Sequence, residues 1–196
     1  MKDYAPEEKA ILKQLEDGLS PNLHYHGLHH TRDVMEAALR IASSEGLPED
    51  QIRLLRIAVL YHDSGFVVNS KDHESHGCEI AKRNLPAYGY SPKEIETICG
   101  MIMATRIPQS PHNLLEKIIC DADLDYLGRD DFNRISRSLY EEIKLSGQNL
   151  GERDWSLLQK KFLENHHYFT EFGKKNREPL KQQHLRKIND LLAQLA

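Results

Sequence analysis

The sequence predicts an all-α fold, and three observations lead to this prediction. No stretch shows the sustained alternation of apolar and polar residues that marks a half-buried strand. Helix-opening and helix-ending signals divide the chain into segments of about 10 to 20 residues, the usual length of a globular helix. The chain has 196 residues, enough for one hydrophobic core, and contains no repeat, low-complexity stretch or linker. We therefore expect one helical domain over residues 1–196.

The expected helices follow from local signals along the chain. "LPEDQI" and "SPKEIE" each place a proline near the first turn with acidic residues behind it, which favours a helix start. The stretches "EGLP", "DSG", "YGYSP" and "SGQNLGE" are typical of helix ends. The predicted helices span residues 6–18, 28–45, 48–62, 73–85, 91–105, 112–127, 130–146, 151–168 and 177–195.

Composition excludes several classes of protein. Charged residues make up 29% and apolar residues 39%, as in soluble globular proteins, and no apolar run approaches the roughly 18 residues of a membrane span. The net charge is −4, and no basic block is typical of nucleic-acid binding. The first residues have the composition of neither a signal peptide nor a transit peptide, and the three cysteines form no C-x-x-C pair. We therefore expect a cytoplasmic protein that binds neither membranes nor nucleic acid.

Eleven histidines are many for this length, and the segment "GLHHTRDV" shows how to choose among them. On a helical wheel, the apolar arc of the helix that begins here contains Val34 and Ile41. His30 lies one turn before Val34 at the edge of this arc, whereas His29 lies on the polar side. We therefore expect His30 to point inward and His29 to face water.

The next predicted helix is apolar nearly all round, in "IRLLRIAVLY", yet it runs into His62 and Asp63. Burying an uncompensated carboxylate costs several kcal/mol or more, and a bound cation removes this cost. Adjacent helical residues point about 100° apart, so both side chains can reach one ion only at a helix end. The "SG" that follows provides such an end.

A third predicted helix also carries carboxylates after an apolar run. "LLEKIICDADLDYLG" places Asp121 and Asp123 at this point. Each of the three features, taken alone, is more simply explained by a core histidine or by an aspartate that caps a helix. Three of them in one small domain favour a metal site, because imidazole and carboxylate are both common metal ligands.

At these residues the chain resembles the HD superfamily of metal-dependent phosphohydrolases, which is all-helical. "HHTRDV" matches the first histidine of the family pattern, "LYHDSG" matches the His-Asp pair, and "KIICDADLDYLGRD" matches the last aspartate. The match covers about residues 23–131, which leaves 132–196 as further helices of the same domain. The resemblance implies that the metal ligands are His30, His62, Asp63 and Asp123.

The last motif leaves two candidates for the fourth ligand. Ala122 before Asp123 matches the family, although Leu124 then follows one position early, so we favour Asp123 over Asp121. We expect the other aspartate to lie nearby and to hydrogen-bond a ligating histidine.

Two imidazoles and two carboxylates leave open positions on the ion and suit Mn²⁺, Fe²⁺, Co²⁺, Ni²⁺ or Zn²⁺ better than Ca²⁺. Such an ion polarises a phosphoryl oxygen and lowers the pKa of coordinated water. Dinuclear members of the superfamily carry extra histidines before the last aspartate, where this chain reads "MATRI", so we expect one metal per chain. The later pair, His166 and His167, either lines a lid over the pocket or lies exposed on a helix.

Four further residues are candidates for contact with a substrate. His73 matches a position at which family members contact phosphate or a second metal. His26 lies one turn before the first candidate ligand, as does the proton-donating histidine of cyclic-nucleotide phosphodiesterases, although Gly27 replaces the usual asparagine. Tyr126 lies in "DYLGRD", which is similar to a nucleotide-contacting segment of triphosphate-cleaving members. Arg106 either contacts phosphate or is an ordinary surface arginine.

The sequence thus predicts a phosphohydrolase with one divalent transition metal, acting on a small phosphorylated compound for which a nucleotide is the leading candidate. It leaves open whether a monoester, a diester or a pyrophosphate bond is cleaved, and it does not fix the oligomeric state. Two alternatives remain. An HD-type di-iron oxygenase needs six or more ligands, and the missing histidine pair disfavours it. A non-catalytic ligand sensor would have kept the metal site and lost turnover.

Overall fold

The computed structural model describes residues 4–194, and within that range every regular element is a helix. The α-helices are α1 (Pro6–Gly18), α2 (Leu28–Ser44), α3 (Glu49–Tyr61), α4 (His73–Asn84), α5 (Pro92–Ala104), α6 (Leu114–Asp123), α7 (Phe132–Leu145), α8 (Glu152–Asn165), α9 (Glu171–Asn176) and α10 (Glu178–Gln194). Short 3₁₀ helices are η1 (Ser64–Val67), η2 (Leu85–Tyr88) and η3 (Asp125–Gly128). The predicted all-α fold is confirmed.

Helix starts follow the signals in the sequence. The Ser91 side chain accepts a hydrogen bond from the backbone N–H of Glu94, and the Glu94 carboxylate accepts one from the Ser91 N–H, with Pro92 in the first turn of α5. Asn113 caps α6 by accepting from the N–H of Glu116 at 3.1 Å. These side chains satisfy N–H groups that a helix start leaves without partners.

Two predicted boundaries differ from the structure near the ends of α6 and α10. The helix predicted over 112–127 ends at Asp123, because Leu124 adopts φ −107° and ψ 19°, and η3 follows. The final predicted helix, 177–195, begins one residue late at Glu178. Its last residue lies outside the described part of the chain.

The helix predicted over 151–168 ends at Asn165 because the next residues bond to another helix. The backbone N–H groups of Phe169 and Thr170 donate to the carboxylate of Asp121 at 2.8 and 2.9 Å. In a continuing helix these donors would pair with carbonyl groups one turn earlier. Thr170 then caps the short helix α9, which the sequence did not predict, with its side chain.

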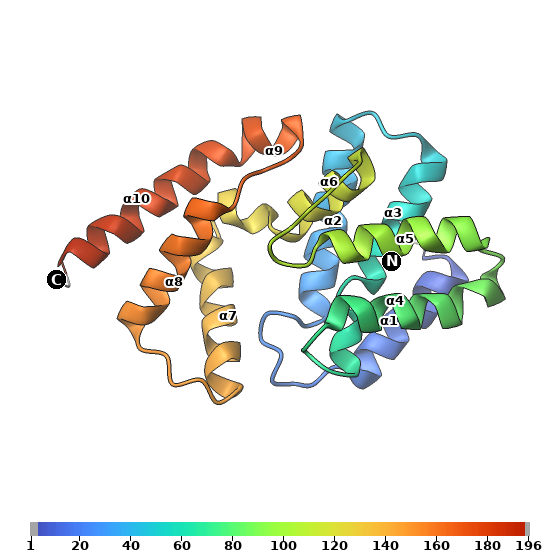
Figure 1. Ribbon diagram of the computed structural model, residues 1–196, viewed down its shortest axis with the longest axis horizontal. Coiled ribbons are helices and arrows are strands. Elements are labelled where there is room, and N and C mark those ends of the chain that lie inside the picture. Colours follow the sequence, from blue (N-terminus) through green and yellow to red (C-terminus); the bar gives the residue numbers. More distant parts are fainter. Residues whose placement is uncertain (1–3, 195–196) are drawn as a thin grey trace.

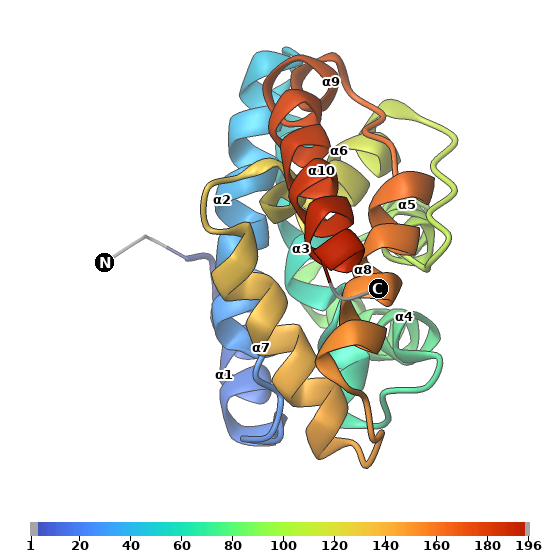
Figure 2. The ribbon, with the colours of Figure 1, turned by 90° about the vertical axis from the view of Figure 1, so that its left-hand side faces the viewer.

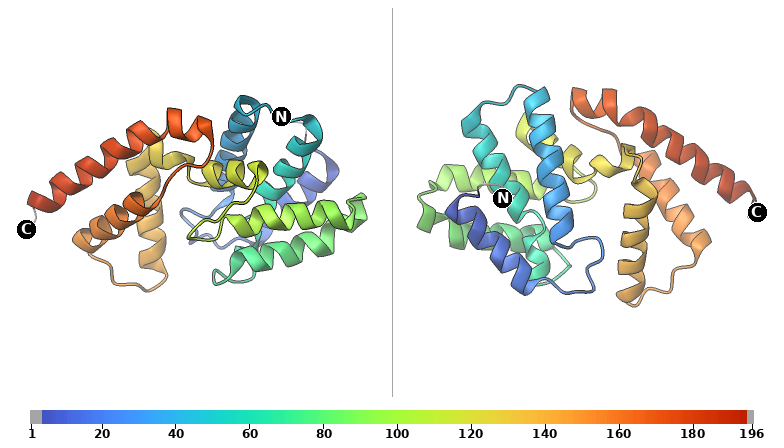
Figure 3. Two further views of the ribbon diagram at one scale, coloured as in Figure 1. Left: turned by 45° about the horizontal axis from the view of Figure 1, so that its top comes forward. Right: turned by 180° about the vertical axis from the view of Figure 1, so that it is seen from behind.

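Helices α1 to α6 form a bundle that encloses the main hydrophobic core (Figure 1). Fully buried residues such as Ile41, Leu55, Ile102 and Ile119 come from four of its helices. We refer to α7, α8 and α10 as the C-terminal arm, which lies to one side of this bundle in both views of Figure 3. Figure 2 faces the arm and shows its three helices in front of the bundle. Among the described helices, none is both long enough and apolar enough to cross a membrane.

The arm and the bundle share a second, smaller core. It consists of Tyr25, Leu124, Tyr126, Leu127, Phe132, Leu163 and Ile188. Asp125 of η3 joins the two parts, because its carboxylate is 1% exposed and lies 2.7 Å from guanidinium nitrogens of both Arg40 in α2 and Arg177 before α10. A buried carboxylate needs such compensation, so these contacts hold the start of α10 against the bundle.

Candidate functional site

Three helix ends bring two histidines and two aspartates together, as the sequence predicts. His30 lies in the first turn of α2, His62 and Asp63 directly follow α3, and Asp123 is the last residue of α6. The His30 Nε2 atom lies 3.0 Å from Asp123 Oδ1 and 3.5 Å from Asp63 Oδ2. The His62 Nε2 atom lies 3.2 Å from Asp63 Oδ2 and 3.7 Å from Asp123 Oδ1. His30 is buried and His29 is exposed, so the predicted helical phase is confirmed.

These side chains meet the requirements of a metal site. One ligand atom from each of His30, His62 and Asp123 lies within 4.8 Å of the others. The Nδ1 atom of His62 donates to the carbonyl of Val59 at 2.7 Å, which leaves the Nε2 lone pair of the neutral ring directed at the carboxylates. His62 Nε2 and Asp63 Oδ2 are buried and have no hydrogen-bond partner among the described residues. Buried atoms of this kind call for a ligand, and a divalent cation would pair with both.

The charges at the centre favour a cation in the same place. Burial lowers the pKa of His62, but Asp63 and Asp123 outweigh it and raise that pKa well above its usual value. Burial raises the pKa of Asp123, but His30 and His62 outweigh it and lower that pKa to about 2. Two ionised carboxylates are therefore stabilised by positive charge beside them. Either protons on the histidine rings or a bound metal ion can provide that charge.

Two glycines allow α4 to approach the His62-Asp63 turn closely. A Cβ atom on Gly65 would lie 1.9 Å from the carbonyl oxygen of His73, and one on Gly77 would lie 2.6 Å from the carbonyl oxygen of Tyr61. Only glycine permits such approach. Because these two glycines have no side chain, the start of α4 can lie beside the candidate metal ligands.

Asp121 forms hydrogen bonds with residues other than those predicted. Its carboxylate is fully buried and accepts hydrogen bonds from the N–H groups of Phe169 and Thr170 and from the Thr170 hydroxyl, the last at 2.6 Å. Burial raises the pKa of Asp121 to about 6, and these hydrogen bonds oppose the rise. Among the described residues it hydrogen-bonds no ligating histidine, so that expectation is wrong. Asp121 anchors the segment between α8 and α9.

His73 lies beside the candidate metal ligands. Its Nε2 atom is 3.4 Å from Asp63 Oδ1 and 3.5 Å from Glu74 Oε1. Burial lowers its pKa, but Asp63 outweighs this and raises it. The ring of Phe66 lies 4.3 Å from the His73 ring, centroid to centroid, and equally far from that of His26. Phe66 and Glu74 are therefore parts of the site that sequence reasoning missed.

His26 is held by a residue of the arm. Glu142 of α7 pairs through Oε1 with His26 Nδ1, and its Oε2 accepts from the N–H groups of Tyr25 and His26 at 2.7 and 3.0 Å. Burial raises the pKa of Glu142, but the hydrogen bonds from His26 outweigh this and lower it. The partners are more than a hundred positions apart, at separations of 116 and 117, so no local pattern could have identified Glu142.

Arg106 and Tyr126 occupy different environments. The Arg106 guanidinium lies 3.0 Å from the Ser75 hydroxyl, 3.3 Å from Asp72 and 3.4 Å from Glu74, and it is not among the described residues that line the pocket next to the metal site. Tyr126 does line that pocket, is buried and packs edge to face against Tyr25 at 5.6 Å. Of these two predicted contacts, only Tyr126 is positioned to meet a ligand directly.

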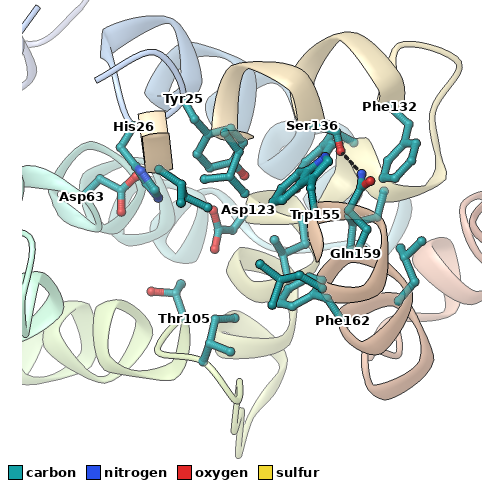
Figure 4. Close-up of a pocket in the computed structure, with 18 of the residues that line it drawn as sticks. Tyr25, His26, Asp63, Thr105, Asp123, Phe132, Ser136, Trp155, Gln159 and Phe162 are labelled. Atoms are coloured by element: carbon teal, nitrogen blue, oxygen red, sulfur yellow. Dashed lines mark hydrogen bonds between the residues drawn. The ribbon is translucent and has the colours of Figure 1, made fainter. Parts of the chain in front are cut away.

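The pocket has a volume of about 280 Å³ and runs from the metal site into the arm. Figure 4 shows the two ends. The polar end is lined by His26, Asp63, His73, Glu74, Thr105 and Asp123. The other end is lined mainly by apolar side chains of η3, α7 and α8, which are Leu127, Phe132, Leu139, Ile143, Trp155, Leu158, Phe162 and Leu163, together with the polar pair Ser136 and Gln159.

The fold and the site together define an all-helical protein with a candidate histidine–aspartate metal centre at one end of a pocket. The family model described as HD domain matches residues 27–125, which is more than half of the chain and includes all four candidate ligands. The chain therefore belongs to the HD domain family. Membership of this family supports a metal-dependent hydrolase.

Two solved structures have the same fold over nearly the full length of both chains. A protein from an uncultured Thermotogales bacterium, described as a predicted HD superfamily hydrolase, is 24% identical with a TM-score of 0.64, over 97% of this chain and 94% of that one. A protein from Lactobacillus plantarum is 16% identical with a TM-score of 0.64, over 98% of this chain and 96% of that one. No curated protein matches the chain.

Proposed function

We propose that this protein is a metal-dependent phosphohydrolase that cleaves a phosphate ester or anhydride of a small molecule, with a nucleotide as the leading candidate. One observation carries the proposal. Within residues 4–194, the buried atoms His62 Nε2 and Asp63 Oδ2 have no hydrogen-bond partner, and they face His30 and Asp123 at the polar end of a pocket. Such an arrangement of imidazole and carboxylate groups is suited to binding a catalytic metal.

The ligands we propose are His30, His62, Asp63 and Asp123, holding one divalent ion of Mn, Fe, Co, Ni or Zn. When bound, such an ion polarises a phosphoryl oxygen and lowers the pKa of coordinated water. Asp121 is not included, because its oxygens already accept hydrogen bonds from Phe169 and Thr170.

The surrounding residues have roles that do not require a second ion. His73 can donate a hydrogen bond to a phosphoryl oxygen or to Asp63, which its Nε2 faces at 3.4 Å. His26 has its Nδ1 paired with Glu142, so Nε2 is the nitrogen left to give a proton to the leaving oxygen. Arg106 acts at most indirectly, through its contact with Glu74.

The test is metal-dependent phosphate release. Chelator-treated protein, shown to be metal-free, is assayed before and after addition of Mn²⁺, Co²⁺ or Ni²⁺. The panel of compounds contains phosphate monoesters, phosphodiesters and nucleotides. We expect phosphate or pyrophosphate release only after metal is restored. Release that persists unchanged in metal-free protein would contradict hydrolysis by this centre. Metal uptake without release from any compound would favour the ligand sensor.

A further inference from the structure

The apolar end of the pocket, which is lined by η3, α7 and α8, is suited to an organic group and not to phosphate. Trp155 and Phe162 of α8 and Phe132 of α7 contribute aromatic rings there, beside aliphatic side chains of the same helices. Trp155 and Phe132 are 8% and 2% exposed, so these walls are part of the folded core and not a loose surface. A group that displaces water from such walls is stabilised by the hydrophobic effect and by aromatic contact.

The pocket offers few positive charges. No lysine or arginine is among the described residues that line it, whereas Asp63, Glu74 and Asp123 are. The nearby guanidinium of Arg106 already contacts Asp72 and Glu74 and is directed to those carboxylates. A metal ion, together with His26 and His73, compensates one phosphoryl group. Apart from these two histidines and Thr105, the polar end is lined by carboxylates, so further phosphoryl groups would lie against carboxylates or apolar side chains. Burying such charges without partners is unfavourable.

The size of the pocket also limits the number of phosphoryl groups that a bound substrate can place inside it. Its volume of about 280 Å³ is slightly below the usual range of ligand pockets, which is roughly 300 to 1,000 Å³. Part of that volume belongs to the metal site, so one phosphoryl group and one ring system of moderate size would fill the pocket. A triphosphate joined to the same ring system would extend beyond it.

One polar pair interrupts the apolar wall. The amide nitrogen of Gln159 in α8 donates to the hydroxyl of Ser136 in α7 at 2.7 Å. This bond leaves the amide oxygen of Gln159 as an acceptor and the hydroxyl hydrogen of Ser136 as a donor. Figure 4 shows the pair at the far end of the pocket from Asp63 and His26. A planar heteroaromatic ring with both donors and acceptors on its edge would pair with it.

We propose that the substrate is a phosphomonoester whose organic part contains an aromatic or heteroaromatic ring, held between α7 and α8 with its polar edge at Gln159 and Ser136. This inference rests on the proposed function and narrows it. Hydrolysis breaks the bond between phosphorus and the ester oxygen and forms one between phosphorus and the oxygen of water. One proton of that water ends on the ester oxygen, so the products are the free alcohol and inorganic phosphate.

The first experiment measures binding of two phosphonates that cannot be hydrolysed, to protein loaded with Mn²⁺. We expect phenylphosphonate to bind about 10-fold more tightly than methylphosphonate by calorimetry, because only its ring reaches the arm. Trp155→Leu and Gln159→Leu are the test variants, and Leu157→Ala, on the exposed face of α8, is the matched control. The Trp155 variant should lose most of the preference for phenylphosphonate while its affinity for methylphosphonate changes less than about 2-fold.

The second experiment compares kcat/KM for a nucleoside monophosphate, the corresponding triphosphate and glycerol phosphate. We expect the monophosphate to be the best substrate, with Gln159→Leu reducing its kcat/KM about 10-fold and leaving glycerol phosphate nearly unchanged. A triphosphate that is cleaved faster than the monophosphate would overturn this inference and leave the proposed function standing. Equal binding of the two phosphonates would also overturn it. If no compound is cleaved with any metal, the proposed function fails, and the phosphonate preference still decides whether the arm binds a ring.

Discussion

The α1–α6 bundle and the C-terminal arm line the same pocket and contribute opposite chemistry to it. The bundle lines the pocket with the ionisable residues His26, Asp63, His73 and Asp123, and the other two candidate ligands, His30 and His62, lie directly behind the two aspartates. The arm lines the pocket with apolar side chains and one amide–hydroxyl pair, and its Glu142 holds the pocket residue His26. The family match ends at residue 125, before α7 begins at Phe132. The match therefore contains the candidate metal ligands of the bundle, whereas the apolar end of the pocket is lined mainly by residues that follow it.

This difference leads to a general expectation for variants. A change among the ligands in the bundle should alter metal binding and so affect every substrate alike. A change in the arm should leave the metal in place and affect substrates unequally, according to the organic group or the leaving oxygen. The predictions below test this division, from the largest expected effect to the smallest.

The largest effect is expected at the His62-Asp63 turn. His62→Ala and Asp63→Ala each remove a buried group that faces the other three candidate ligands, so the metal should be lost and phosphate release should fall by more than about 100-fold. Elemental analysis of the purified proteins, with the wild type as reference, measures the metal directly. The wild type should contain about one metal per chain. Two per chain would contradict the mononuclear site and favour the di-iron oxygenase.

The second prediction compares adjacent histidines on α2. His30→Ala should abolish metal binding, because His30 Nε2 lies 3.0 Å from Asp123 and 3.5 Å from Asp63. His29→Ala should keep nearly full metal content, because His29 is exposed on the other side of the helix. Metal content per chain distinguishes the two variants. The reverse result would refute the assignment of the first ligand.

The third prediction separates the two aspartates of α6. Asp123→Asn should greatly reduce phosphate release, because it removes a ligand charge. Asp121→Asn should keep the metal but lower the free energy of unfolding by about 1 to 3 kcal/mol, because its amide would place N–H groups against the donors of Phe169 and Thr170. Metal analysis and chemical denaturation of both variants provide the measurements. If folded Asp121→Asn lacked metal, Asp121 would be the better candidate ligand.

The fourth prediction concerns the one carboxylate that the arm contributes to the site. Glu142→Gln keeps an acceptor for the backbone N–H groups but weakens the pairing that orients His26. If His26 protonates the leaving oxygen, kcat should fall about 10-fold or more for an alkyl phosphate, whose leaving group needs that proton. It should fall much less for p-nitrophenyl phosphate, whose leaving group does not. Glu141→Gln, a half-exposed neighbour on α7 that pairs with Arg137 and does not contact His26, is the control. Equal losses for both substrates would show that Glu142 acts only on structure.

The same contrast explains how far sequence reasoning reached. His30, His62, Asp63 and Asp123 could be predicted because each interrupts an apolar helix at its end, and such interruptions are visible within a few residues of sequence. The phase that separates His30 from His29 could be read from the apolar arc through Val34 and Ile41. Local patterns therefore indicated these four residues of the bundle, with the family resemblance favouring Asp123 over Asp121, but they did not indicate Phe66 or Glu74.

The contacts that sequence reasoning missed depend on side chains far apart in the chain. Glu142 reaches His26 across 116 positions, and Asp121 reaches Phe169 across 48. The second contact is the reason why α8 ends at Asn165 and not near residue 168. The sequence around Glu142 or around Asp121 gives no signal for its distant partner. A glutamate exposed to solvent and one that orients a histidine can occur in the same local sequence.

The smallest effect is expected in the pH dependence of stability, at the end of α8. For His166 and His167 the sequence allowed two positions, in a lid over the pocket or exposed on a helix. In the structure both residues follow the end of α8 at Asn165. His166 Nε2 is buried without a hydrogen-bond partner among the described residues, and its Nδ1 lies 3.4 Å from the ammonium of the buried Lys181. Burial and the charge of Lys181 lower the pKa of His166 from 6.5 to about 3. The folded protein therefore keeps this ring neutral in mild acid.

The sign of the effect follows from proton uptake. Below pH 6.5 the unfolded chain protonates His166 and the folded chain does not until the pH falls to about 3, so stability is lost as the pH decreases between these values. Because the side chain is only partly shielded from water, we expect a loss of about 1 to 2 kcal/mol between pH 7 and pH 5. His166→Gln should remove this part of the pH dependence, whereas His167→Gln, at an exposed position, should retain it. Urea denaturation of the three proteins at both pH values measures the difference. If His166→Gln lost as much stability as the wild type on acidification, proton uptake by His166 would not be the cause, and the arm would owe its acid sensitivity to other groups.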